Sequence, residues 1–413
     1  MSEPRPAHGT LSFGCWLCCL LIVWGTVSTA AAEPPPQWIL VTTPALAEAA
    51  TPLIQRRGDQ GYEVIVIDVA TLPDAEGGPD VAAALRALES ADRDRSVLLL
   101  GTWEERLADA WVPPLTGTQG RMQGRATDHG YGAPAADGGA AIAVGRLPAR
   151  SLEEARAMVS RILKFEDLQV QQNQIHLFVG HPGGRTEFER NFAANIIRTA
   201  VDQRLKRVHE QWSITCLMDL DDSPYSVAAA DFGGQLKRTL QQGQLFSVYS
   251  GHSSPAAIYS RQGPVVQRAD FASLQMSGPQ GVLLSCGCYS CQVEGVQGQG
   301  YGISAIRNAD GPVAVIGAFG ESYAAHGQLA FDGVLACLAQ ENPPRRLGAY
   351  WLAIQNGIAR GEISQTEFLL YDMADGSNGQ VPLEQQRREH AQMWTLLGDP
   401  ATLIPLAPAI DNN

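Results

Sequence analysis

Short apolar runs alternate with helical patterns along the first part of the chain. Buried strands are predicted where such runs occur, at residues 38–42, 62–67 and 96–101. Helices are predicted between them, at residues 50–55 and 81–88. Strands that alternate with helices are typical of a parallel sheet with right-handed crossovers. The pattern therefore predicts an α/β fold.

A long irregular segment follows this alternation. Residues 103–139 are rich in Gly, Pro and Asp, which favour turns, and we expect them to form irregular surface. The apolar run at residues 141–148 predicts a further strand. Ser151 then fits the N-cap of a helix that reaches about Glu166, because serine at this position can accept a hydrogen bond from the first helical turn.

The alternation restarts after a glutamine-rich run at residues 169–174, which we interpret as a boundary between two subdomains. Strands are predicted at residues 175–179, 213–218, 245–249, 282–284 and 313–317, and helices at residues 187–203, 231–241, 329–340 and 347–359. The sum is an α/β sandwich of two unequal sheets. We expect an N-terminal α/β subdomain over residues 38–170 and a C-terminal subdomain over residues 171–406.

The first residues have the pattern of a signal peptide. Residues 14–27 are nearly all apolar, Arg5 precedes them and small residues follow at 28–32. The run is shorter than the roughly 20 residues that a membrane-spanning helix needs. We therefore expect a signal peptide over residues 1–32, a linker over residues 33–37, and export to the periplasm or the extracellular space with no stable membrane span after cleavage. An uncleaved anchor is the alternative interpretation.

Composition narrows the possible partners. Among 413 residues, 43 are acidic and 30 are basic, which gives a formal net charge of −13. This balance argues against nucleic acid or an anionic membrane surface as the partner. Of the eight cysteines, three lie in the predicted signal peptide. The remaining five are an odd number, so we expect at least one thiol to be free or paired outside the chain.

Candidate catalytic side chains follow two of the predicted strands. His252 comes shortly after the strand at residues 245–249, and Cys286 and Cys288 come shortly after the strand at residues 282–284. Parallel strands in an open α/β sheet end at the same edge, so neighbouring strands can bring an imidazole and a thiol together. An imidazole that takes the proton of a nearby thiol is the arrangement of a histidine–cysteine hydrolase.

The cysteine cluster also has interpretations that involve no catalysis. Cys286, Cys288 and Cys291 could form a structural disulfide, which could coexist with catalysis or mask the nucleophile reversibly. A zinc site is a further alternative, although the second pair of ligands usual in such sites is absent at matching spacing.

Four segments resemble the gingipain-like family of cysteine peptidases, and they occur in the family's order. The segments are residues 127–132 (TDHGYG), 142–155 (IAVGRLPARSLEEA), 249–254 (YSGHSS) and 394–400 (WTLLGDP). The resemblance covers about residues 38–405. It implies a caspase-like three-layer α/β sandwich whose C-terminal subdomain holds the site, and hydrolysis of peptide bonds in protein or peptide substrates through a thioester. It implies no catalytic cofactor, and it suggests structural Ca²⁺ only by family analogy, at acidic loops such as the one that holds Asp219.

The same resemblance implies that His252 acts as general base and acid. The nucleophile of this fold follows three apolar residues, a small polar residue, a buried residue and a small one, which fits Cys288. Counting back from Cys286 places a glycine and a glutamine where apolar residues belong, so Cys286 is the alternative nucleophile. Backbone N–H groups around Gly251, Ser253 and Cys288 would form the oxyanion hole.

Two departures from the family pattern leave the partner of the histidine open. Ser253 stands where the family usually has glycine, and residues 181–184 (HPGG) stand where gingipains have a glutamate that orients the histidine. A backbone carbonyl could orient His252 instead, or the dyad could act unassisted. The departures also leave a second function open, namely a catalytically inactive envelope protein that serves binding or assembly.

The resemblance places one wall of the substrate pocket at Glu321, Ser322 and Tyr323. In arginine-specific relatives an acidic residue lies shortly after the orienting glutamate, and Glu187 or Glu189 could occupy that place here. A preference for a basic residue before the scissile bond is therefore a hypothesis.

Overall fold

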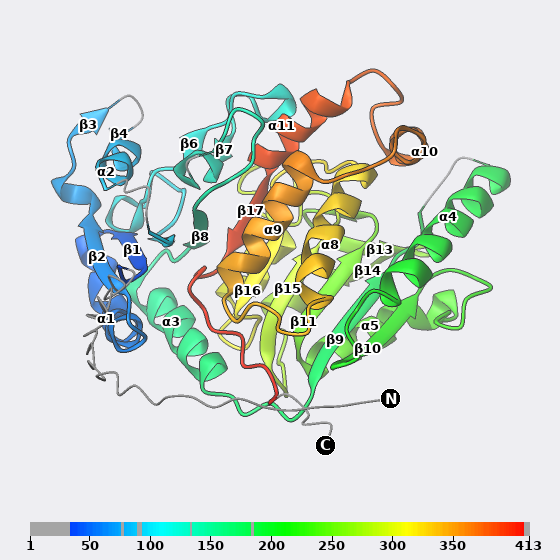
Figure 1. Cartoon of the computed structure of the whole chain (residues 1–413), viewed down its shortest axis with the longest axis horizontal. Coiled ribbons are helices and arrows are strands. Elements are labelled where there is room, and N and C mark those ends of the chain that lie inside the picture. The colour runs from blue at the N-terminus through cyan, green and yellow to red at the C-terminus, as the bar shows by residue number, and fades with distance from the viewer. Residues whose placement is uncertain (1–33, 76–77, 89–92, 133, 183–185, 409–413) are drawn as a thin grey trace, which may run out of the picture. The chain divides into compact units, whose positions relative to one another are not determined.

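The structure is a computed structural model of the whole chain, shown in Figure 1. It describes residues 34–75, 78–88, 93–132, 134–182 and 186–408. The predicted signal peptide, residues 1–32, lies outside the described residues. Among the helices that are described, none is long and apolar enough to cross a membrane.

A large sheet organises the residues from Pro35 onward (Figure 1). Its strands are β1 (Gln37–Thr42), β2 (Glu63–Asp68), β5 (Arg95–Leu100), β8 (Ala143–Leu147), β9 (Asn173–Val179), β10 (Trp212–Met218), β11 (Gln244–Ser250), β15 (Gln280–Ser285), β16 (Ala314–Ala318) and β17 (Trp394–Leu397). Their order is β10-β9-β11-β15-β16-β17-β8-β5-β1-β2. Neighbours pair in parallel, except that β16 and β17 are antiparallel.

The mostly parallel sheet confirms the predicted α/β class, with one difference in how the halves join. The two expected sheets are continuous, because β17 from the end of the chain lies between β16 and β8 and pairs with both. The apolar run of β17 was not predicted as a strand. The predicted subdomain boundary at residue 170 falls in the connection between the last helix of the first half and β9.

Helices and short strands fill the connections. The helices are α1 (Pro44–Asp59), α2 (Val81–Ala87), α3 (Leu152–Glu166), α4 (Glu187–Leu205), α5 (Ala229–Gln242), α6 (Arg268–Ala272), α7 (Tyr301–Arg307), α8 (Ala324–Leu338), α9 (Leu347–Arg360), α10 (Gln365–Asp375) and α11 (Leu383–Met393). The short strands are β3 (Asp74–Ala75), β4 (Gly78–Pro79), β6 (Leu115–Thr116), β7 (Ala126–Thr127), β12 (Ser253–Ser254), β13 (Ala257–Ser260) and β14 (Gly263–Gln267). Single 3₁₀ turns occur at Val69–Thr71, Ala108–Ala110, Gly120–Met122 and His129–Gly132. The segment expected to be irregular, residues 103–139, therefore contains only short elements.

Two neighbouring residues at the end of β15 show how the layers are stacked. The hydroxyl of Ser285 hydrogen-bonds the hydroxyl of Tyr301 on α7 at 2.5 Å. Cys286 packs instead on α8, where a Cβ added to Gly327 would lie 3.5 Å from the Cys286 Cβ. Successive side chains along a strand point to opposite faces, so α7 and α8 cover opposite sides of the sheet. This is the three-layer sandwich expected from the resemblance, and α8 and α9 form the layer in front of the sheet in Figure 1.

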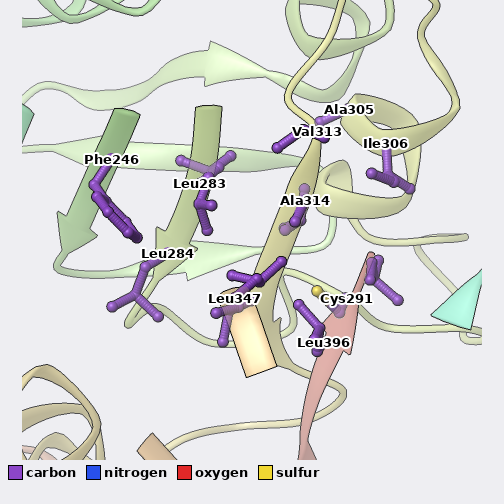
Figure 2. Close-up of a cluster of buried hydrophobic side chains, with 14 of the residues drawn as sticks. Phe246, Leu283, Leu284, Cys291, Ala305, Ile306, Val313, Ala314, Leu347 and Leu396 are labelled. Atoms are coloured by element: carbon purple, nitrogen blue, oxygen red, sulfur yellow. The ribbon is translucent and has the colours of Figure 1, made fainter. Parts of the chain in front are cut away.

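The strands that carry the candidate site are anchored in the hydrophobic core. Leu283 and Leu284 of β15 lie beside Ala314 of β16 in Figure 2. Cys291 belongs to the same cluster and is 0% exposed, with its sulfur among apolar side chains such as that of Leu396. The five cysteines in the described part of the chain are all free thiols. Cys291 is therefore a core residue here and not a disulfide partner.

Asp399, from the WTLLGDP segment, forms a buried ion pair that joins the two ends of the chain. Both Asp399 and Arg57 of α1 have fully buried side chains, and their charged atoms lie 2.7 Å apart. Asp399 also accepts a hydrogen bond from the indole of Trp38 at 3.0 Å. Arg57 pairs in addition with Glu166 at the end of α3, at 2.7 Å. Asp399 also accepts a hydrogen bond from the backbone N–H of Ala401, at 3.0 Å.

Two of the other family segments, residues 127–132 and 142–155, meet in a similar way. Arg146 on β8 is fully buried and forms two hydrogen bonds to the carboxylate of Asp128, at 2.7 and 2.8 Å. Its remaining N–H groups donate to backbone carbonyls of Gly101 and Val112. A bidentate pair whose other donors are also satisfied fixes the irregular segment onto the sheet. Asp128 therefore has a structural role that depends on Arg146.

Two buried histidines lie where α8 meets α11. The rings of His326 and His390 stack with centroids 3.9 Å apart, and both side chains are fully buried. His390 Nδ1 donates to the carbonyl of Gln386 at 2.7 Å, and its Nε2 accepts from the N–H of Tyr323 at 3.0 Å. Burial lowers the pKa of His390 to about 4 and that of His326 well below its ordinary value, and the nearby Arg121 opposes protonation further.

We predict that Asp399→Ala lowers the free energy of unfolding by about 3–5 kcal/mol, because it leaves the Arg57 guanidinium buried without one of its two carboxylate partners. Urea denaturation measures this change. The matched control is Glu48→Ala, which removes an exposed ion pair to Arg156 and should cost less than about 1 kcal/mol. Equal costs for the two variants would contradict a stabilising role of the buried pair.

We also predict that stability falls as the pH drops from about 6.5 towards 4. The unfolded chain binds a proton on His390 near its ordinary pKa of about 6.5, whereas the folded chain resists it until about pH 4, so protons favour unfolding in this window. His390→Gln removes one such group and should flatten the slope by up to about 1.4 kcal/mol per pH unit. Identical slopes in the variant and the unchanged protein, measured by urea denaturation at several pH values, would refute this.

Candidate active site

The site is built on two adjacent strands, β11 and β15, as the sequence predicted. They pair in parallel with Tyr249 opposite Ser285. The ladder continues one residue further, where the N–H of Cys286 donates to the carbonyl of Tyr249 at 2.7 Å. Because parallel strands end at the same edge, the segments that carry His252 and Cys288 leave the sheet side by side.

A direct contact joins these two segments. The hydroxyl of Ser253 donates to the carbonyl of Cys288 at 2.6 Å. Gly287 makes this approach possible, since a Cβ there would lie 2.2 Å from the Ser253 hydroxyl oxygen. Tyr289 then turns the chain with φ of 57°, which is uncommon for a residue other than glycine. The residue after the candidate nucleophile is thus held in a special backbone conformation.

His252 and Cys288 line the same pocket, which has a volume of about 110 Å³. Cys286, Ser322 and Asp375 also line it. The structure therefore brings the predicted histidine together with both candidate cysteines.

The ring of His252 is oriented by a backbone carbonyl. Its Nε2 lies 2.7 Å from the carbonyl oxygen of Pro182, which can only accept, so Nε2 carries the proton and donates it. Pro182 belongs to the turn in which the family's glutamate is missing. One of the two possibilities left open by the sequence, a carbonyl in place of the carboxylate, is the arrangement found here. Nδ1 of His252 is then the nitrogen that can accept a proton.

Asp375, the last residue of α10, was not anticipated from the sequence. Its carboxylate lies 3.7 Å from Nδ1 of His252, and the two side chains are 46% and 37% exposed. Burial raises the pKa of Asp375, and the neighbouring His252 partly offsets that rise. Residues 365–375 show no motif, and α10 itself was not predicted. This carboxylate lies 123 positions further along the chain than His252. Only the fold brings it beside the imidazole ring of His252.

The two candidate nucleophiles have different surroundings. The thiol of Cys288 donates to the carbonyl of Ser322 at 3.4 Å. Burial raises the pKa of Cys288 to about 12, and the negative charge of Asp375 adds to the rise. Burial alone raises the pKa of Cys286 to about 12. The pKa of Cys288 therefore depends on the charged groups of the site, whereas Cys286 packs against α8.

Two of the three residues expected to form the oxyanion hole lie at the pocket. Within the part of the chain that the structure describes, the N–H groups of Gly251 and Cys288 have no hydrogen-bond acceptor. Both residues line the pocket. Ser253 instead holds the two segments together through its hydroxyl.

The predicted pocket wall is only partly at the pocket. Ser322 lines it and accepts from the Cys288 thiol. Glu321 points to Arg121, whose guanidinium lies 3.0 Å from its carboxylate. The same guanidinium lies over the ring of Tyr323, with its carbon 3.9 Å from the ring centroid. The backbone N–H of Tyr323 donates to Nε2 of His390. Glu321 and Tyr323 therefore support the wall from outside.

Two carboxylates of the acidic loop near Asp219 pair with an arginine. Asp219 is fully buried, and its two carboxylate oxygens accept from the side chain and the backbone N–H of Arg261, at 2.8 and 2.6 Å. Asp221 pairs with the same guanidinium at 2.6 Å. No group of three or more metal-binding side chains was found among the described residues.

Comparison with known proteins places this geometry in context. A family model described as Peptidase family C25 matches residues 31–405. A search of curated proteins found no match. Among solved structures, the chain is similar to the Arg-specific cysteine proteinase gingipain R (RgpB), with 15% identity, a TM-score of 0.61 and coverage of 91% of this chain and 79% of that one.

Two further solved structures give the same result. One is the complex of Porphyromonas gingivalis RgpB pro- and mature domains, with 15% identity, a TM-score of 0.60 and coverage of 89% and 79%. The other is described as a protease, with 16% identity, a TM-score of 0.64 and coverage of 90% and 79%. At such low identity these similarities show the fold alone, and the gingipain-like, caspase-like fold expected from the sequence is confirmed. Since the family model spans most of the sequence, the chain belongs to peptidase family C25.

Proposed function

We propose that this protein is an exported cysteine endopeptidase in which Cys288 is the nucleophile and His252 the general base and acid. The observation that carries this proposal is that both side chains line one pocket, on adjacent strand ends joined by the Ser253–Cys288 hydrogen bond. Membership of a peptidase family supports the reaction class.

The first step forms the nucleophile. Since the pKa of Cys288 is raised to about 12, the resting thiol is neutral and needs a base. Nδ1 of His252 takes the thiol proton while Nε2 stays bonded to Pro182. The resulting imidazolium lies 3.7 Å from Asp375, whose negative charge favours it. Asp375 thus acts on the histidine as a positioning and charge-balancing residue.

The thiolate then attacks the carbonyl carbon of the peptide bond. A carbon–sulfur bond forms, and the carbonyl oxygen becomes an oxyanion that the N–H groups of Gly251 and Cys288 can bind. His252 returns its proton to the nitrogen of the leaving amine as the carbon–nitrogen bond breaks, which leaves a thioester. Water, deprotonated by the same imidazole, hydrolyses the thioester and regenerates the thiol.

Export rests on the N-terminal pattern. Residues 1–32 have the charged, apolar and small-residue regions of a signal peptide. We include secretion to the periplasm or beyond in the proposal on this basis.

An inactive relative that serves binding or assembly is the second function considered. It would keep the same fold and pocket without using the thiol. The test below separates the two.

We predict that iodoacetamide, applied after mild reduction, labels the protein on Cys288 and that Cys288→Ala abolishes both this label and peptidase activity. His252→Ala should lower activity by about 10²- to 10⁴-fold, because proton transfer by a positioned side chain contributes that much. Peptide mapping and cleavage of a mixed fluorogenic peptide library measure these effects.

Two further cysteine variants sharpen the test. Cys337→Ala changes a buried cysteine on α8 outside the pocket and should leave labelling and cleavage unchanged. Cys286→Ala decides the identity of the nucleophile, since activity that disappears in this variant and survives in Cys288→Ala would assign Cys286. Labelling that is indifferent to Cys288 and His252, with no cleavage, would support the inactive relative.

A further inference from the structure

The pocket beside His252 and Cys288 extends into an apolar space. Its far walls come from α4, β9 and α8. Apolar residues that line it include Ala193, Ile197 and Val201 of α4, Leu177 and Val179 of β9, and Phe331 of α8. A substrate side chain in this space would make dispersion contacts with the walls and would be shielded from water, but it would meet no charged group there.

We propose that this space binds an apolar side chain of about leucine or methionine size, on the substrate residue that supplies the scissile carbonyl. This inference rests on the proposed function and adds the substrate class. The reason is connectivity: the carbon that Cys288 attacks is bonded to the Cα of that residue. Its side chain must therefore enter the space next to the thiol, and this pocket is lined by Cys288 itself.

The size of the space fits an aliphatic side chain. Its volume is about 110 Å³. An apolar cavity of about 150 Å³ holds a benzene molecule, so the present space suits a branched or flexible aliphatic group better than a large aromatic one. Ile197 and Val201 lie on one face of α4, so their side chains set the depth of the space from the helix side.

The distribution of charge disfavours a basic side chain. Among the described residues that line the pocket, Asp375 is the only carboxylate, and it lies at the end beside His252. Behind the lining residue Gln328 lies the guanidinium of Arg204, which already pairs with the carboxylate of Asp332 at 2.9 Å. A basic side chain that entered the part of the space lined by α4, β9 and α8 would therefore place its cation among apolar groups, away from Asp375.

The earlier hypothesis of a basic preference has little support from these positions. Glu187, at the start of α4, is exposed and does not line the pocket. The side chain of Glu189 lies outside what the structure describes. The positions on α4 that line the space are apolar, and Ala193 is one of them.

Binding and cleavage are measured separately to test the inference. N-acetyl peptide amides that differ only in a C-terminal Leu, Met, Arg or Lys are titrated into Cys288→Ala, which needs no catalysis. The same four residues are compared before the fluorogenic group in cleavage by the unchanged protein. We expect Leu and Met to exceed Arg and Lys by at least about 10-fold in both assays, since burying an unpaired charge costs more than one methylene group gains.

Variants on α4 locate the effect. Ala193→Asp should reduce the preference for Leu over Arg by about 10-fold or reverse it, and the matched control Asn191→Asp adds the same charge at an exposed position and should leave the preference unchanged. Ile197→Ala deepens the space and should shift the preference from Leu towards Phe.

Each outcome decides the inference. Tighter binding of Leu and Met peptides to Cys288→Ala supports it even if the unchanged protein cleaves nothing, in which case only the proposed function fails. Tighter binding or faster cleavage of Arg or Lys peptides overturns it, as does a preference that Ala193→Asp and Asn191→Asp change equally.

Discussion

The parallel register between β11 and β15 is the constraint on which the rest of the site depends. Tyr249 lies opposite Ser285, so the segments that hold His252 and Cys288 begin at the same level of the sheet. A shift of one residue would turn every side chain of β15 to the other face and would exchange Cys286 and Cys288 for Ser285 and Gly287 at the pocket. The buried leucines of β15 prevent such a shift, because they would lose their core contacts.

Buried ion pairs hold segments far from the site in place. Arg57 and Asp399 join the first helix to the end of the chain, and Arg146 and Asp128 fix the irregular segment. Both carboxylates lie in segments that resemble the family. Since neither lines the pocket, the resemblance in these segments reflects the fold and not the chemistry. A buried charge without its partner is costly, which explains why a distant arginine and aspartate must occur together.

The sequence predicted the strands of the sheet better than the helices and connections around the sheet. Apolar runs such as that of β11 are continuous because both faces of a parallel strand are covered, and this signal is local. β17 was not predicted because it is short, and α11 was not predicted because it is mostly polar. A backbone carbonyl was one of two possibilities that the sequence left open for the group that orients His252, since a turn without a carboxylate still has backbone acceptors; in the structure it is that of Pro182. Asp375 could not be found, because only the packing of α10 brings it to His252.

The central claim is that the Cys288 sulfur forms a covalent acyl intermediate with a proton passed to His252. Rapid quenching of the reaction with an activated peptide ester, followed by mass spectrometry of the digested protein, tests it most directly. The account predicts an added mass equal to the acyl group on the peptide that contains Cys288, assigned to that residue by fragmentation, with much slower formation in His252→Ala. An acyl group on another residue, or none while product accumulates, would contradict it.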